Sequence, residues 1–361
     1  MKKYDLIREG NLFRIIALKD FGFIKKGELG GLIEKESNLS QKNECWIHEN
    51  ASVTGNAKVY GNASVTGNAL VSGNALVSGD AYVYGNALVS GNAEVTENAK
   101  VCGNAEVSGN AEVSGNALVF GYALVSGDAK VSGNAKVSGN AKVFGNAEVS
   151  GNAKVFGNAE VTGNAKVYGN AKVYENASVT GNAEVSGNAK VFGNALVSGD
   201  AEVYGNAEVS GNAEVSGDAK VYGNAKVYGN ATVYSTTEVT GNAKVYGNAL
   251  VTGNAEVTGN AEVTGNALVT GNALVTGNAE VYGNALVSGD AKATKEVITS
   301  GNIFDYDITI TDNHIKIGCQ QYLKSRWLEF TNKEILEMDG KRALKFWGLF
   351  KPFAINMGFF N

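Results

Sequence analysis

The middle of the chain alternates apolar and variable residues in a six-residue unit, A-x-V-x-G-N. The unit repeats about forty times from Ala51 to about Ala291, without insertion or deletion. Alanine recurs at every sixth position in this range except at Thr237, and valine recurs two residues after each alanine position from Val53 to Val287. Alternation with a period of two is typical of a strand with one buried face. The pattern therefore predicts a long series of short strands.

The glycine and asparagine of each unit predict a sharp corner after every strand. Glycine adopts positive φ angles without steric cost, and a short polar side chain can hydrogen-bond within its own turn. A helix is excluded, because one Gly and one Asn in every six residues would cost about 1 kcal/mol or more per unit. Aspartate takes the place of asparagine at Asp80, Asp128, Asp200, Asp218 and Asp290.

Short strands that turn every six residues could form hairpins or wind into a coil. Near-identical repeats favour the coil, because stacking places Val over Val and lets Asn side chains form ladders along each corner. Three units that close a triangle give about 18 residues per coil. The predicted fold is an all-β solenoid, a triangular parallel β-helix with three hexapeptides per coil and a thin core of Ala and Val.

The spacing V-x-G-N-A-x resembles the hexapeptide repeat of left-handed β-helix proteins, in which a small residue follows an aliphatic one four positions later. This resemblance implies a left-handed coil, whereas the general rule for parallel crossovers would give the opposite hand. Residues 17–51, ALKDFGFIKKGELGGLIEKESNLSQKNECWIHENA, are similar to the leading segment of an uncharacterised bacterial and phage-encoded branch of these proteins. Members of this branch are often labelled acyltransferases on the fold alone. The resemblance covers roughly residues 10–300.

Both ends of the chain depart from the repeat. Stacked coils need caps, because their terminal strands would otherwise expose unpaired edges. We expect residues 1–44 to form a small N-terminal cap, residues 45–296 the β-helix, and residues 297–361 a small α+β C-terminal domain. Within the cap, 12–18 is predicted to be a strand and 21–31 a glycine-rich loop. Cys45 and Ile47 take the Ala and Val positions of the first coil.

The C-terminal segment contains signals for a hairpin and for helices. Residues 308–310 and 314–317 alternate around Asp312 and Asn313, which predicts two antiparallel strands. Thr331 and Glu334 form a capping box for a helix through Met338, and a second helix, 341–349, is expected to end before Pro352. Five aromatic residues are expected to form a core in preference to a binding platform: Trp327, Phe330, Trp347, Phe350 and Phe353.

Composition and charge narrow the class of protein. The chain holds 47 glycines but one proline, which fits neither collagen nor a disordered chain. The net charge of −5 identifies no partner, because both signs are abundant. The first residues mix charges without a continuous apolar stretch, so we expect neither a signal peptide nor a membrane span. Three distant cysteines predict no disulfide framework or metal cluster, and they fit a cytoplasmic protein without a cofactor.

The sequence offers few residues for catalysis. The resemblance implies acyltransferases that act as trimers, with a catalytic histidine and a loop extruded from the helix. This chain has two histidines, His48 and His314, and no insertion from 51 to 291 that could form such a loop. His48 follows the inward Ile47 and should face outward. His314 with Cys319 could form a nucleophilic pair, although a turn residue and a half-buried thiol are the simpler interpretation. We therefore expect no catalysis or, failing that, acyl transfer.

Every third repeat should fall on the same side of a three-sided coil, so the register sorts the outward residues. One side carries leucines beside Ser or Thr, an apolar stripe expected to be an interface between copies. These leucines are Leu70, Leu88, Leu124, Leu196, Leu250, Leu268 and Leu286.

A second side carries lysines and aromatic residues, a combination found on surfaces that bind single-stranded nucleic acid. The alternative is that both residue types merely stabilise and solubilise a β surface. The lysines are Lys136, Lys154, Lys172, Lys190, Lys226 and Lys244, and the rings are Phe156, Tyr174, Phe192, Tyr228 and Tyr246. The third side mixes Glu and Lys, as a solvated surface does.

Three functions remain open at this point. The preferred one is a non-enzymatic scaffold, a rigid β-helical rod that self-associates or presents its C-terminal domain to a protein partner. The second is a rod that binds a polyanion or nucleic acid through the lysine-bearing side. The third is an acyltransferase of the hexapeptide-repeat superfamily, by analogy of fold alone.

Overall fold

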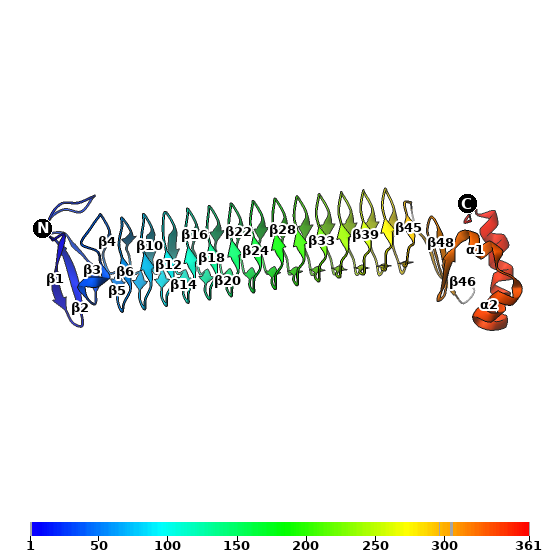
Figure 1. Ribbon diagram of the computed structural model, residues 1–361, viewed down its shortest axis with the longest axis horizontal. Helices are drawn as coiled ribbons and strands as arrows, with labels where there is room; N and C mark the ends of the chain where they lie inside the picture. Colours follow the sequence, from blue (N-terminus) through cyan, green and yellow to red (C-terminus); the bar gives the residue numbers. More distant parts are fainter. Residues whose placement is uncertain (1, 296, 304–305, 361) are drawn as a thin grey trace. The chain divides into compact units, whose positions relative to one another are not determined.

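The computed structural model describes residues 2–295, 297–303 and 306–360. It divides into two compact units, Met1–Gly205 and Asn206–Asn361, hereafter unit 1 and unit 2. Figure 1 shows stacked coils within each unit. The predicted domain boundary at residue 296 lies outside the described residues.

The coil strands follow the repeat without a change of period. They run from β4 (Trp46–Ile47) to β30 (Glu202–Val203) in unit 1, and from β31 (Glu208–Val209) to β45 (Lys292–Ala293) in unit 2. Most are two residues long, an outward residue and the valine after it, while β10 (Tyr82–Gly85) and β13 (Lys100–Gly103) are longer.

Each coil strand pairs in parallel with the strand one coil away. In β5 (Ser52–Val53), for example, Val53 lies beside Val71 of β8 (Leu70–Val71), 18 residues later. The coil strands of each unit therefore form three parallel sheets, one for each side of the triangle. This confirms the predicted fold class, an all-β solenoid that forms a parallel β-helix with three hexapeptides per coil.

The core of the coils contains the side chains that the repeat predicts. The alanines and valines of the hexapeptides are at most 2 % exposed. Thr237, which takes the place of an alanine, is also fully buried, and its hydroxyl donates to the carbonyl oxygen of Tyr234 at 3.1 Å. This bond satisfies the one polar group that the substitution brings into the core.

The corners combine positive φ angles with hydrogen bonds between coils. Gly139, for example, has a φ of 70°, and a Cβ atom there would lie 2.9 Å from the carbonyl oxygen of Gly157 in the next coil. The Asn140 side chain donates to that of Asn158 at 3.0 Å, as predicted for an asparagine ladder. Glu175 replaces a corner glycine at φ 62°, and its carboxylate accepts the N–H of Gly193 at 2.9 Å.

The N-terminal segment extends one of the sheets of unit 1. Strands β1 (Tyr4–Glu9) and β2 (Leu12–Ala17) form an antiparallel hairpin. Strand β3 (Leu29–Ile33) pairs antiparallel with β2 and parallel with β5, and the short helix η1 (Glu36–Asn38) follows it. The sheet edge of the first coil is thus covered, as expected of a cap.

The predicted glycine-rich loop at 21–31 was wrong in its last three residues, which belong to β3. Gly30 and Gly31 serve close packing here rather than a turn. A Cβ atom on Gly30 would lie 2.5 Å from both the Ile15 side chain and the carbonyl oxygen of Ile47. Glycine is therefore required for close packing at these two positions of the cap and for positive φ angles at the corners.

Cys45 occupies the alanine position of the first coil, as predicted, and is fully buried. The buried Lys3 ammonium donates to the Cys45 carbonyl oxygen at 2.8 Å and lies 3.2 Å from its sulfur. Burial lowers the pKa of Lys3 and raises the pKa of the Cys45 thiol. Lys3 thus ties the N-terminus to the first coil.

The C-terminal part of unit 2 is an antiparallel sheet covered by helices. The sheet contains β46 (Ile298–Ile303), β47 (Tyr306–Ile310), β48 (His314–Ile317) and β49 (Gln320–Leu323). The hairpin of β47 and β48 confirms the prediction around Asp312 and Asn313. Helices α1 (Lys324–Glu329) and α2 (Asn332–Asn356) follow. At the start of α2, Glu334 accepts the Thr331 N–H at 2.8 Å, which confirms the capping box.

The predicted end of the second helix before Pro352 was wrong, because α2 continues to Asn356 with Pro352 inside it. Proline removes one backbone donor from the ladder, and the fully buried Ala354 holds the last turn in place by packing. The aromatic core is confirmed for Trp327, Phe330, Trp347 and Phe350. Phe353 was wrongly included, since it is 50 % exposed.

The turn between β47 and β48 closes the last coil of unit 2. The Asp312 N–H donates to the Lys292 carbonyl oxygen at 2.9 Å, and the Asn313 side chain accepts the Lys292 N–H at 2.8 Å. The Asp312 carboxylate accepts the Thr294 N–H at 2.7 Å. These bonds supply the partners that a following coil would have supplied.

Candidate functional site

The lysine–aromatic face of unit 1 carries four lysines in register. They are the outward residues of β19 (Lys136–Val137), β22 (Lys154–Val155), β25 (Lys172–Val173) and β28 (Lys190–Val191), and each lies directly beside the next. In unit 2, Lys226 of β34 (Lys226–Val227) lies beside Lys244 of β37 (Lys244–Val245).

The two units differ in how these lysines are neutralised. In unit 2, Lys226 pairs with Glu208 at 3.3 Å and Lys244 with Glu262 at 2.6 Å. The carboxylate of Glu262 raises the pKa of Lys244 and has its own pKa lowered in return. Positive charge is therefore partly cancelled on this face of unit 2.

In unit 1, by contrast, no ion pair joins Lys136, Lys154 or Lys172 to any residue that the structure describes. Lysines on the other two faces of unit 1 do meet glutamates, as in Lys142 with Glu160 at 2.9 Å. The lysine–aromatic face of unit 1 is thus a concentrated patch of positive charge.

The rings on this face stack on one another. Phe156, Tyr174 and Phe192 have centroids 4.9 Å apart and planes within 3° of parallel. Tyr228 and Tyr246 in unit 2 stack at 4.8 Å. Because both faces of Tyr174 are covered by its neighbours, a nucleobase has no room to lie flat on that ring. Base stacking, the usual use of aromatic residues in single-strand binding, is therefore blocked inside the stack.

The leucine face is interrupted in unit 1 and continuous in part of unit 2. Leu70 lies beside Leu88, but Glu106 separates Leu88 from Leu124. Leu196 lies beside Ser178. In unit 2, Leu250, Leu268 and Leu286 of β38 (Leu250–Val251), β41 (Leu268–Val269) and β44 (Leu286–Val287) form an unbroken row. All three are half-buried.

The histidines do not form a catalytic group with the cysteine. His48 in unit 1 is half-buried, and burial lowers its pKa. In unit 2, His314 pairs with Leu323 at the open end of the β48–β49 hairpin, whereas Cys319 lies in the hairpin turn at the other end. Strand length therefore separates this thiol from the imidazole, and no Cys–His pair forms.

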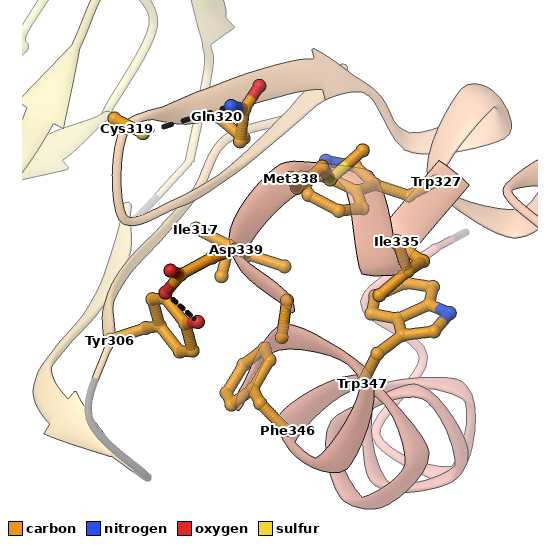
Figure 2. Close-up of a pocket in the computed structure, with 11 residues that line it drawn as sticks. Tyr306, Ile317, Cys319, Gln320, Trp327, Ile335, Met338, Asp339, Phe346 and Trp347 are labelled. Carbon is orange, nitrogen blue, oxygen red and sulfur yellow. Dashed lines mark hydrogen bonds between the residues drawn. The ribbon is translucent and has the colours of Figure 1, made fainter. Parts of the chain in front are cut away.

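A cavity in unit 2, which sequence reasoning missed, is a further candidate site (Figure 2). It has a volume of about 290 Å³ and lies between β47, β48 and the helices. Most of its lining is apolar, while Cys319, Gln320 and Asp339 contribute polar groups on one side, as Figure 2 shows. The apolar lining comprises Tyr306, Ile317, Trp327, Ile335, Met338, Ala343, Phe346 and Trp347.

A break in α2 places Asp339 at this cavity. Asp339 and Gly340 leave the helical conformation, and Gly340 has φ 61° and ψ −152°, a region that glycine alone adopts readily. The Tyr306 hydroxyl donates to one Asp339 oxygen at 2.5 Å, and Arg342 lies 3.8 Å from the same oxygen. This break lies between the two predicted helices, the first through Met338 and the second from 341, and confirms that division.

Among the described residues, no group of three or more His, Cys, Asp or Glu side chains could hold a metal ion. In the same part of the chain, none of the helices has the length and apolar character needed to cross a lipid bilayer.

A comparison with protein-family models finds no match, and a comparison with curated proteins finds none either. Among solved structures, the chain is similar to the one described as "Activity and Crystal Structure of Arabidopsis UDP-N-acetylglucosamine acyltransferase". The identity is 15 %, the match covers 53 % of this chain and 70 % of the other, and the TM-score is 0.26. A likeness this distant carries no argument about function, and the fold assignment rests on the strand register described above.

Proposed function

We propose that this protein is a non-enzymatic scaffold, in which the β-helical coils support the C-terminal domain of unit 2 for a partner. The observation that carries the proposal is the unbroken register of the coils within each unit. No loop leaves the coils between 51 and 205 or between 206 and 293 in the described structure. A smooth coil surface of this kind offers no deep cleft for an acyl donor.

Acyl transfer is the alternative function that an activity assay must exclude. The test is release of free thiol from acetyl-CoA and longer acyl-CoA donors, with a panel of amine and hydroxyl acceptors. We expect no release above the blank, because no loop leaves the described coils to hold an acyl donor beside a histidine. Turnover that disappears in His48→Asn or His314→Asn would reject the scaffold and support an acyltransferase.

Polyanion binding by the lysine–aromatic face of unit 1 is a second candidate function, supported by the run from Lys136 to Lys172 without described ion pairs. Because base stacking is blocked inside the ring stack, charge should carry most of the binding. Dextran sulfate should therefore compete as well as oligo(dT) of equal charge.

Salt dependence measures how many lysines take part. Log affinity for oligo(dT) should fall linearly with log salt, and Lys154→Gln should reduce that slope by roughly 0.7. Lys142→Gln, on a different face and paired with Glu160, is the matched control and should leave the slope unchanged. Equal slopes in the parent, Lys154→Gln and Lys142→Gln would exclude polyanion binding by this face.

A further inference from the structure

We infer that the cavity of unit 2 is a binding site for a small, neutral, two-ring or similarly sized apolar molecule that carries one hydroxyl or amino group. This site is separate from the coil faces, and it goes beyond the scaffold function. The inference rests on the cavity's size, its mainly apolar lining and the position of Asp339 (Figure 2).

The volume of the cavity limits the size of the ligand. An apolar cavity of about 150 Å³ is known to hold benzene in another protein, and the volume here is about 290 Å³. Trp327, Trp347 and Phe346 are each at most 4 % exposed, so their rings are packed from behind and present fixed walls. Water gains few hydrogen bonds against such walls, and an apolar molecule would displace it favourably.

The polar residues of the cavity indicate which functional group the ligand carries. Asp339 is an acceptor-only side chain, and one of its oxygens already accepts from Tyr306. The other oxygen has no hydrogen-bond donor among the described residues. The Asp339 side chain is 52 % exposed, so a ligand donor can reach this oxygen by displacing water. Arg342 balances the charge of the carboxylate, which favours a neutral donor such as a hydroxyl over a full cation.

The probes that test this inference are 1-naphthol and naphthalene, which differ by one hydroxyl. Both are titrated against the full chain in competition with N-phenyl-1-naphthylamine, whose emission rises in apolar sites. We expect 1-naphthol to bind roughly threefold to tenfold more tightly, because the carboxylate accepts a charge-assisted hydrogen bond but is half exposed to competing water. Equal affinities for the two probes, or no binding of either, would overturn the inference.

Two variants locate the binding. Asp339→Ala should abolish the preference for 1-naphthol while naphthalene binding persists, and that persistence shows that the cavity is intact. Ala343→Leu should fill the cavity and weaken both probes at least tenfold. Glu337→Ala, which removes a neighbouring exposed carboxylate outside the cavity lining, is the control. Unchanged probe binding in Asp339→Ala and Ala343→Leu would mean adventitious association with an apolar surface and would overturn the proposal.

The reactivity of the Cys319 thiol measures independently whether a probe occupies the cavity. It is exposed and lines the cavity, whereas Cys45 and Cys102 are buried, so N-ethylmaleimide should modify Cys319 first. Saturating 1-naphthol should slow this modification severalfold. An unchanged rate at saturation would place the bound probe elsewhere and contradict the inference.

Discussion

His314 is a titratable side chain whose burial affects the stability of unit 2. It is half-buried in β48, and its Nδ1 atom is buried without a hydrogen-bond partner among the residues described. Burial lowers the pKa of the imidazole below its ordinary value of 6.5, and the nearby Asp290 offsets this in part. The neutral imidazole is therefore the form that the folded unit 2 prefers.

This preference predicts an acid-sensitive unit 2. Below pH 6.5 the unfolded chain binds a proton at His314 that the folded chain resists, so the free energy of unfolding falls as the pH falls. Above pH 6.5 the residue contributes no pH dependence. Urea denaturation between pH 5 and pH 8 should show a shallower acid limb in His314→Gln than in the parent. If the free energy of unfolding changed with pH equally in the two proteins, the effect assigned to His314 would be contradicted.

At the scale of elements, helix α2 depends on the conformation of one glycine. Gly340 has a backbone conformation that other residues adopt at a cost of about 1–3 kcal/mol. No neighbouring atom lies within 4 Å of where its Cβ would be, so the cost of a side chain is backbone strain rather than a clash. The break at this glycine also holds Asp339 beside the cavity.

Gly340→Ala should therefore lower the stability of unit 2 by about 1–3 kcal/mol. Gly348→Ala is the matched control, because Gly348 lies in the helical part of α2 with open space around it. That change should stabilise the helix by roughly 0.5–1 kcal/mol. Thermal unfolding followed by tryptophan emission compares them in a Trp46→Phe background, in which Trp327 and Trp347 are the emitting tryptophans. Equal shifts of the same sign would refute the role given to Gly340.

The coil strands could be predicted from the sequence because their determinants are local. Each hexapeptide contains its own buried residues and its own corner, as Val53 and Gly55 show, and identical neighbours fix the register. Strand β1 and helix α1 were not predicted, since their short sequences lack such a period. The cavity could not be predicted at all, because it exists only where β47, β48 and α2 pack together.

At the scale of the whole molecule, the leucine face determines whether copies associate. The row of Leu250, Leu268 and Leu286 in unit 2 is the longest unbroken run of leucines in the described coils. Apolar rows of this kind are typical of interfaces, and a parallel or antiparallel pair of chains could bury one against another. We propose that copies of the protein associate through this row.

Light scattering over a range of concentrations tests the proposal. The parent should show a mass above that of the monomer, and Leu268→Lys should shift it toward the monomer, because a buried ammonium opposes association. Leu274→Lys, which adds the same charge to a different face of unit 2, should leave the mass unchanged. Equal masses for the two variants would exclude the leucine face as the interface.

The constant period of 18 residues also limits how the gene can change in length. Loss of one hexapeptide within unit 1 would rotate every later residue of that unit to the next face, and the lysines would exchange places with leucines or glutamates. Loss of three hexapeptides removes a complete coil and leaves each face as it was, because residues 18 apart are direct neighbours. Unequal recombination between these near-identical repeats should therefore persist in natural variants as whole-coil steps, wherever selection acts on a face.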